Sequence, residues 1–359
     1  MAFKLPFKHC TPQSRSQITA ARRGMRQAVS IRTPVVACKP WTACGNNERC
    51  YTTARVSGSN ITGLPKEAEV GTKRFADFDL AGKTFVVTGG ARGLGLALAE
   101  ALVEAGGKGI IKISSSHEKY AVFDDVIVYC LDRLPQPDQE WQRAAQRVIP
   151  EWGGSLKYRQ LDVNNTSDLN EIIEGIAHQN GGIQGVIAAA GIQQLTPAIE
   201  YKEEDINKML QTNYTAAFMT AQAAARMMLK YKSHGSICFV ASMSGSVANK
   251  GLLSSAYNSS KAALIQLARN LAMEWSDTTT NNGGGIRVNC LSPGHIITPM
   301  VLKNFEEVPG LRDTWSQANM MNRLAETSEF KGAALFLMSN ASTFMTGSNL
   351  IIDGGHTAW

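Results

Sequence analysis

The feature that most constrains this chain is a regular alternation of apolar, strand-like runs with helical stretches from Asp79 onward. A strand followed by a crossover helix returns parallel to its neighbour, so the alternation predicts a parallel sheet with helices on both faces. We therefore expect one α/β domain over residues 79–359 with a doubly wound, seven-stranded parallel sheet. The expected strands are 84–87, 126–131, 156–160, 185–189, 237–240, 286–290 and 349–352, and the expected helices lie around 93–105, 167–178, 203–230, 256–275 and 326–339.

The first expected strand leads into a glycine-rich turn and then a helix. After Thr88, the glycines have the spacing Gly-x-x-x-Gly-x-Gly, at Gly89, Gly93 and Gly95. Such glycines let the backbone approach a pyrophosphate, which then sits at the positive end of the helix. A turn of this kind between an apolar strand and a helix indicates a Rossmann-type dinucleotide-binding fold.

Tyr257 and Lys261 stand four residues apart in a stretch that is compatible with a helix. That spacing puts both side chains on one face, one turn apart. A free tyrosine titrates at about 10, so it needs a nearby cation to act as a base at neutral pH. Lys261 can supply that cation. If this pair stood alone, it would be read as two unrelated surface residues. That interpretation does not account for the glycine-rich turn that the same chain carries upstream.

With these elements, residues 79–359 resemble the short-chain dehydrogenase/reductase family. The matching elements follow one another in the family's order: Thr88-Gly89-x-x-x-Gly93-x-Gly95, Asp162-Val163, Asn213, Ser242, Tyr257-x-x-x-Lys261, Pro293-Gly294 and Asp353-Gly354-Gly355. The resemblance implies an oxidoreductase that transfers a hydride between a nicotinamide cofactor and a secondary alcohol or ketone.

The resemblance also implies a role for each catalytic residue. Tyr257 would transfer the hydroxyl proton, while Lys261 would lower the pKa of Tyr257 and hold the nicotinamide ribose. Ser242 would hydrogen-bond the reacting oxygen, and Ser244 is its rival for that role. Asn213 would hold a water that connects Lys261 to solvent.

Around the cofactor, the resemblance implies a larger set of residues. They are Thr88, Gly89, Arg92, Gly93, Leu94, Gly95, Asp132, Arg133, Asp162, Val163, Ala189, Gly191, Tyr257, Lys261, Pro293, Gly294, Ile297 and Thr298. One family element is missing, because the chain has Ala188-Ala189-Ala190-Gly191 where members usually carry Asn-Asn-Ala-Gly. A side-chain hydrogen bond that braces the central strands is thereby lost.

The choice between NAD and NADP depends on residues near the end of the second expected strand. A carboxylate at Asp132 would hydrogen-bond the ribose 2′-hydroxyl and repel a 2′-phosphate. Arg92 and Arg133 act in the opposite direction, since guanidinium groups suit a phosphate. We expect NAD, with NADP as the alternative.

Three segments, 241–245, 257–261 and 353–359, resemble fungal polyol dehydrogenases and ketose reductases of the arabinitol 2-dehydrogenase and sorbose reductase types. The expected small-molecule substrate is therefore a sugar alcohol or ketose. One alternative is a mitochondrial 3-oxoacyl-carrier-protein reductase, although residues 295–325 carry three acids and three bases rather than a basic docking surface. Another is a non-catalytic nucleotide-binding sensor or scaffold. The resemblance further implies a homotetramer packed through the helices 203–230 and 256–275.

Positive charge is concentrated before the expected domain. Residues 1–60 hold ten Lys and Arg and one acid, whereas residues 61–359 hold 26 bases and 29 acids. The basic segment is rich in Arg and Ser and lacks the apolar core of a secretory signal, a pattern typical of a mitochondrial presequence. We expect a presequence over 1–51, a linker over 52–78 and a location in the mitochondrial matrix. A basic tail on a cytoplasmic protein is the alternative.

Nucleic-acid, membrane and metal partners are not expected. The remainder of the chain is slightly acidic, so it offers no basic patch for nucleic acid. The longest stretch without Asp, Glu, Lys or Arg, 175–199, contains Gly, Gln, Asn and a proline, which argues against a transmembrane helix. The separations between histidines match no metal-site spacing.

An excess of residues separates the glycine turn from the cofactor-selecting acid. Asp132 lies 37 positions after Gly95, whereas a dinucleotide fold places that acid about 20 residues after the turn. The excess falls around 109–127, in a stretch without clear helical or strand periodicity. A genuine surface loop or a retained in-frame intron would each explain it, and under either reading we expect the chemistry to be unaffected.

Overall fold

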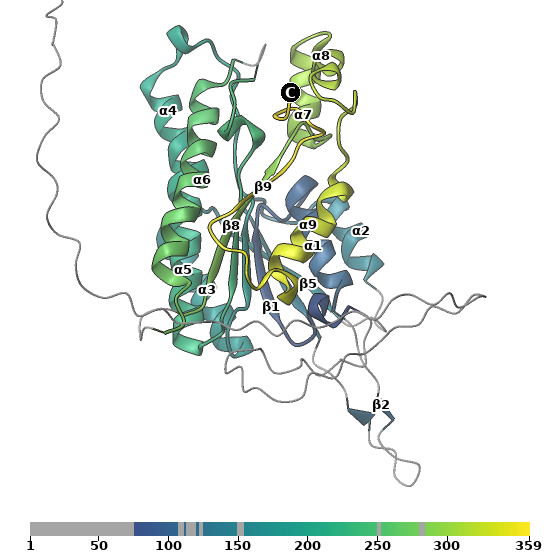
Figure 1. Ribbon diagram of the computed structural model, residues 1–359, viewed down its shortest axis with the longest axis vertical. Coiled ribbons are helices and arrows are strands. Elements are labelled where there is room, and N and C mark those ends of the chain that lie inside the picture. Colours follow the sequence, from purple (N-terminus) through teal and green to yellow (C-terminus); the bar gives the residue numbers. More distant parts are fainter. Residues whose placement is uncertain are drawn as a thin grey trace, which may run out of the picture. The chain divides into compact units, whose positions relative to one another are not determined.

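A seven-stranded parallel sheet lies at the centre of the computed structural model (Figure 1). Its strand order, β5-β4-β1-β6-β7-β8-β9, is that of a doubly wound Rossmann-type domain, and each neighbouring pair runs parallel. The predicted fold class is confirmed. The strands are β1 (Thr84–Thr88), β4 (Ile127–Asp132), β5 (Ser155–Gln160), β6 (Gly185–Ala188), β7 (Ser236–Val240), β8 (Arg287–Pro293) and β9 (Asn349–Ile352).

The structure describes residues 75–106, 111–112, 120–121, 125–148, 154–249, 253–279 and 284–359. The predicted presequence, and the predicted linker as far as residue 74, lie outside them. What is described belongs to one compact unit, Glu67–Trp359, and begins with a 3-10 turn at Ala76–Phe78. Within these residues, no helix has the length and apolar character needed to span a bilayer.

Helices cover both faces of the sheet (Figure 1). The central strands β1, β6 and β7 are buried along their whole length, which is why they form continuous apolar runs rather than alternating ones. One face carries α1 (Gly93–Glu104), α2 (Gln139–Arg147) and α9 (Lys331–Met338), and the other carries α3 (Thr166–Asn180), α5 (Ala216–Tyr231) and α6 (Ser255–Trp275).

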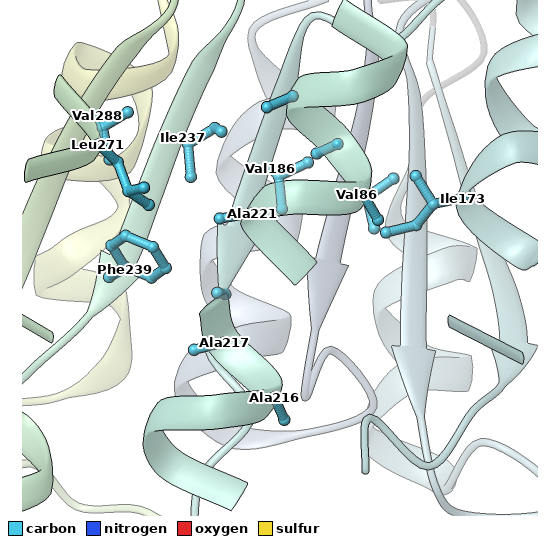
Figure 2. Close-up of a cluster of buried hydrophobic side chains, with 14 of the residues drawn as sticks. Val86, Ile173, Val186, Ala216, Ala217, Ala221, Ile237, Phe239, Leu271 and Val288 are labelled. Atoms are coloured by element: carbon cyan, nitrogen blue, oxygen red, sulfur yellow. The ribbon is translucent and has the colours of Figure 1, made fainter. Parts of the chain in front are cut away.

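Small side chains form the inner surface of α5. Ala216, Ala217 and Ala221 are buried in the same cluster as Val186 of β6 and Ile237 of β7 (Figure 2). An alanine loses no side-chain entropy in a helix, and its small volume lets the helix lie close to the sheet at the density of a protein interior. The alanine-rich sequence of α5 therefore sets the spacing between these two layers.

The predicted helical stretch 203–230 is confirmed, with a local irregularity inside it. The chain forms α4 (Glu203–Leu210), then a π-helical turn at Gln211–Thr215, and then α5, with helical backbone at each junction. A π turn adds one residue to a helical turn, which apolar periodicity does not reveal. Such turns occur frequently at functional sites, and this one contains Asn213.

Three helices were not predicted: α2, α7 (Pro299–Glu307) and α8 (Leu311–Gln317). Helix α2 is mostly polar, and its apolar stripe is short: Ala144 is buried, and Trp141 and the C-cap residue Val148 are partly buried against the core. The short helices α7 and α8 pack on each other through a small cluster around Trp315. The helix predicted at 326–339 starts as a 3-10 turn, Thr327–Phe330, before α9.

Two short strands lie inside the predicted insertion. They are β2 (Ile111–Lys112) and β3 (Tyr120–Ala121), which pair antiparallel in a sheet of their own. The sequence showed no clear periodicity for this short pairing, and because much of 109–127 lies outside the described residues, the insertion stays a prediction. The segment connects the end of α1 to the start of β4, and in a doubly wound sheet ligands bind at the opposite, carboxyl ends of the strands.

Candidate active site

A cavity of about 750 Å³ lies where the parallel strands end, and it brings together most of the residues that the sequence predicted. Three of the expected residues, Thr88, Asn213 and Ile297, do not line the cavity. The predicted residues that do line it are Gly89, Arg92, Gly93, Leu94, Gly95, Asp132, Arg133, Asp162, Val163, Ala189, Gly191, Ser242, Tyr257, Lys261, Pro293, Gly294 and Thr298.

The glycine turn is shaped for close approach of backbone to backbone. Gly89 has a φ of 69°, and a Cβ there would lie 2.9 Å from the backbone of Ala190. A Cβ on Gly95 would collide with the carbonyl oxygen of Gly89. No larger residue fits these two positions, and the tightness of the turn leaves room beside it for a pyrophosphate at the start of α1.

Carboxylates hold the glycine turn on the side of β4 and α2. Asp132 accepts a hydrogen bond from the backbone N–H of Ala91, at 3.3 Å. Glu140, in the first turn of α2, accepts from the N–H of Gly93 with both oxygens, at 3.2 and 3.3 Å. Arg92 lies between the two bonded residues. Sequence reasoning missed Glu140 because the contact spans 47 positions and α2 itself was not predicted.

The missing asparagine motif is partly compensated. The hydroxyl of Thr88 accepts a hydrogen bond from the backbone N–H of Ala190, at 3.3 Å. This bond joins the end of β1 to the segment after β6, the place where the usual asparagine would brace the central strands. One connection between the strands is therefore kept through Thr88. The small side chain of Ala190 also lets its backbone lie against Gly89.

Lys261 is buried beneath the site, with 5% of its surface exposed. Its ammonium donates to the carbonyl oxygen of Val240 at 2.8 Å and lies 5.7 Å from the ring centre of Tyr257. Burial lowers the pKa of Lys261 to about 8, because a charge in a low-dielectric interior is disfavoured. At neutral pH the side chain is still mainly protonated, so it can place a positive charge behind Tyr257.

Burial also dominates the titration of Tyr257. It raises the pKa of Tyr257, and a side-chain hydrogen bond with Ser242 acts in the opposite direction. The sequence predicted a pKa lowered by Lys261, whereas in this structure the net shift is upward. Positive charge near the hydroxyl, or a further donor to it, favours the ionised form.

The structure separates the two candidate serines. Ser242 caps a 3-10 turn at Met243–Gly245, where its hydroxyl accepts from the N–H of Ser244 at 3.1 Å. The same side chain lies close enough to Tyr257 to act on its titration, where it lowers the pKa of the phenol against the effect of burial. The hydroxyl of Ser244 instead accepts from the amide of Asn249 at 2.7 Å. Ser242 is thus the serine that adjoins the proton-transfer group.

Asn213 acts on the backbone rather than on the cavity. Its amide accepts from the N–H of Ile192 at 2.8 Å and donates to the carbonyl of Ile192 at 2.9 Å and to Ser260 at 3.0 Å. A Cβ on Gly191 would lie 3.3 Å from Asn213 Oδ1 and 3.5 Å from Lys261 Nζ. The hydrogen bonds of Asn213 with Ile192 position the segment after β6. The predicted role of Asn213 in holding a water stays a prediction.

Residues 295–325, here called the lid, form the remaining wall. Helices α7 and α8 of the lid lie beyond the ends of β8 and β9 (Figure 1). Asn304 of α7 donates to Gln193, which follows β6, at 3.1 Å and so links the two walls of the cavity. Among the described residues, no three His, Cys, Asp or Glu side chains are grouped to hold a metal ion.

Comparisons with known proteins agree with this geometry. A family model described as enoyl-(acyl carrier protein) reductase matches residues 134–357. A short-chain dehydrogenase/reductase of Aspergillus versicolor is 36% identical over 79% of this chain and 89% of its own length. The chain belongs to the short-chain dehydrogenase/reductase family. It is an NAD(P)-dependent oxidoreductase, as the sequence predicted.

Other relatives are named for their substrates. A D-arabinitol 2-dehydrogenase (ribulose-forming) of Candida albicans is 30% identical over 79% of this chain and 95% of its own. A solved gluconate 5-dehydrogenase from Burkholderia cenocepacia, in complex with NADP and tartrate, is 26% identical and superposes with a TM-score of 0.64 over 79% of this chain and 98% of that chain.

The residues present fit a dinucleotide. The cradle at Gly89 and Gly95, which a Cβ would fill, can take the pyrophosphate, and Asp132 can take the adenosine ribose. Tyr257 and Lys261 can take the nicotinamide ribose, next to Ser242. When bound, the nicotinamide ring donates or accepts the hydride.

Replacing Gly95 by alanine should abolish the close approach of α1 to the glycine turn. We expect Gly95→Ala to weaken binding of NAD or NADP by at least about tenfold, or about 1.4 kcal/mol, in a fluorescence titration without substrate. Gly332→Ala is the matched control, because a Cβ there meets no atom within 4 Å. Equal affinity of Gly95→Ala and the control would contradict the cradle.

Proposed function

We propose that this enzyme interconverts a sugar alcohol and a ketose. The observation that carries the proposal is the shared cavity of Ser242, Tyr257 and Lys261 in a chain at least 30% identical to a D-arabinitol 2-dehydrogenase and a sorbose reductase. Other relatives with comparable identity carry the names galactitol 2-dehydrogenase and NADP-dependent mannitol dehydrogenase. The shared feature of these names is a polyhydroxylated substrate.

The chain's own groups then carry the proton chemistry. In the oxidation direction, Tyr257 takes the proton of the reacting hydroxyl, and in the reduction direction it returns that proton to the oxygen. Ser242 holds the reacting oxygen next to Tyr257 and stabilises the charge that develops on it. The ammonium of Lys261 favours the ionised form of Tyr257 during the transfer.

A carrier-protein reductase is supported less well. Docking an acidic carrier protein calls for free cations beside the cavity. The guanidinium of Arg323 in the lid is paired with the carboxylate of Glu329 at 2.6 and 2.8 Å. The lid as a whole has balanced charge, with three bases and three acids. A polyol or ketose needs no such patch.

Tyr257→Phe should lower turnover by about 10²–10⁴-fold while leaving the fold intact, because it removes the proton-transferring hydroxyl but keeps the ring. The measurement is a panel of polyols and ketoses with NAD, NADH, NADP and NADPH on the wild type and the variant. Circular dichroism checks the fold. Near-normal turnover of the variant on the best substrate would refute the role of Tyr257.

We further propose that NAD is the preferred cofactor. Asp132 at the end of β4 and Glu140 on α2 place two carboxylates on the backbone N–H groups of Ala91 and Gly93, the two neighbours of Arg92 in the chain. Together they oppose the attraction of Arg92 for a 2′-phosphate. The solved gluconate 5-dehydrogenase holds NADP and the mannitol dehydrogenase is named as NADP-dependent, so NADP also occurs among similar proteins and stays the alternative.

Removing the charge of Glu140 tests this preference directly. We expect Glu140→Gln to tighten NADP binding relative to NAD by about three- to tenfold, or about 0.7–1.4 kcal/mol, because one repulsive charge is lost and the amide oxygen can still accept from Gly93. Glu204→Gln is the control, since Glu204 also lies in the first turn of a helix. An unchanged ratio of dissociation constants in binding titrations would refute a role for Glu140.

The mitochondrial matrix is our proposed location, on the basis of the basic, Arg- and Ser-rich segment 1–51. Deleting residues 2–51 should leave an active enzyme that stays in the cytosol, because the import signal is lost and the described fold begins later. Cell fractionation with activity assays measures both. Mitochondrial localisation of the truncated protein would rule out this signal.

We also propose that the enzyme is a homotetramer. The outer surfaces of α5 and α6 carry exposed apolar side chains, among them Leu229 and Met273. Exposed apolar side chains of this kind are typical of surfaces that a second subunit covers.

A further inference from the structure

His295 occupies a distinctive place in the cavity wall. It follows Gly294 at the carboxyl end of β8 and lines the same cavity as Ser242 and Tyr257. Its ring stacks on that of Trp315, with centroids 4.1 Å apart and planes at 8°. Trp315 is only 3% exposed, so the indole is a fixed surface that holds the imidazole in one orientation.

The backbone at His295 is pinned as well. The carbonyl of His295 accepts from the N–H of Ala325 at 2.9 Å, and Ile297 donates to the carbonyl of Ala325 at 2.9 Å. Ile296 and Ala325 thereby form a parallel bridge between the two ends of the lid. The backbone that carries the imidazole is therefore fixed to the base of the lid.

The ring of His295 keeps its hydrogen-bonding capacity for the cavity. Among the described residues, neither ring nitrogen of His295 has a hydrogen-bond partner, and neither is sealed from solvent as Nδ1 of the neighbouring His356 is. Burial, and then His356, lower the pKa of His295 to about 3. The imidazole is therefore neutral at working pH and presents one donor and one acceptor.

The surrounding lid surface is mostly apolar. The lid residues that line the cavity with His295 are the apolar Ile296, Pro299, Met300, Val301 and Trp315 and the polar Thr298 and Lys303. A hydroxyl group is both a donor and an acceptor, so it complements a neutral imidazole on such a surface. A polar group fixed in the wall of a binding cavity favours ligands that hydrogen-bond it over analogues that lack the matching group.

We propose that His295 recognises a second hydroxyl of the substrate, distinct from the one that reacts at Tyr257 and Ser242. This rests on the proposed function and adds a residue that selects polyhydroxylated substrates over simple alcohols and ketones. Trp315 positions the imidazole for this contact by stacking on it.

The alternative is a purely structural role, in which the ring only supports the lid by stacking. His295→Phe separates the two roles, since phenylalanine keeps an aromatic ring against Trp315 but removes both hydrogen-bonding nitrogens. His295→Gln does the reverse, because its amide offers a donor and an acceptor without an aromatic ring. His178→Gln, on the outer surface of α3, is the control for changing a histidine elsewhere.

The experiment compares ketoses with ketones of the same chain length. Reduction of ribulose, sorbose and fructose is measured beside 2-pentanone and 2-hexanone, which keep the carbonyl at carbon 2 but lack the other hydroxyls. For His295→Phe we expect KM for the best ketose to rise about 5- to 100-fold, with kcat/KM for the plain ketone and the dissociation constant of the cofactor within about twofold of wild type. His295→Gln should recover part of the ketose affinity.

The outcomes separate this proposal from the one on which it rests. The role of His295 is overturned if His295→Phe lowers kcat/KM equally for the ketose and the plain ketone, or if KM for the ketose is unchanged from wild type. The proposed substrate class is unaffected by either result. A wild type that reduces only the plain ketones overturns the substrate class, and the role of His295 with it. A selective rise in ketose KM, with partial rescue by His295→Gln, supports both.

Discussion

Parallel pairing of all seven strands is the constraint on which the site depends. It directs every strand's carboxyl end to one edge of the sheet, so the segments after β1, β4, β6, β7 and β8 converge there although they are far apart in the chain. Helices must then cover both faces, which buries the central strands β1, β6 and β7 along their whole length. Asp132, Ser242 and His295 each follow or end a strand at this edge.

The two proton-transfer groups lie at the border of the interior, with Lys261 buried and Tyr257 partly buried in the cavity wall. Lys261 takes its hydrogen-bond partner, the carbonyl of Val240, from the end of β7, so the strand that presents Ser242 also anchors the ammonium. Burial favours the neutral form of both Lys261 and Tyr257, and it shifts their pKa values in opposite directions. The pair is therefore sensitive to a charge brought next to it in the cavity, because Coulomb interactions are stronger near a low-dielectric interior than in bulk water.

Much of the fold could be predicted because it follows from local patterns. The strands form apolar runs, and the helices α1, α3 and α6 show the periodicity expected of buried faces. The apolar stripe of α2 is short, with Trp141, Ala144 and Val148, and it was missed among polar residues. The π turn at Gln211–Thr215 adds a residue that periodicity cannot register. Both elements carry side chains that matter at the site: Glu140 on α2 and Asn213 in the π turn.

The order of motifs along the chain by itself determined the family, the fold class and the identity of Tyr257 and Lys261, because these depend on spacing within one helix or one turn. The tertiary structure decided which serine adjoins Tyr257, that a carboxylate from α2 reaches Gly93, and that an imidazole after β8 lies flat on an indole of the lid. Each of these is a contact between groups that neither periodicity nor spacing relates. Such contacts exist only once the sheet and its crossovers have brought distant segments of the chain within a few ångströms of one another.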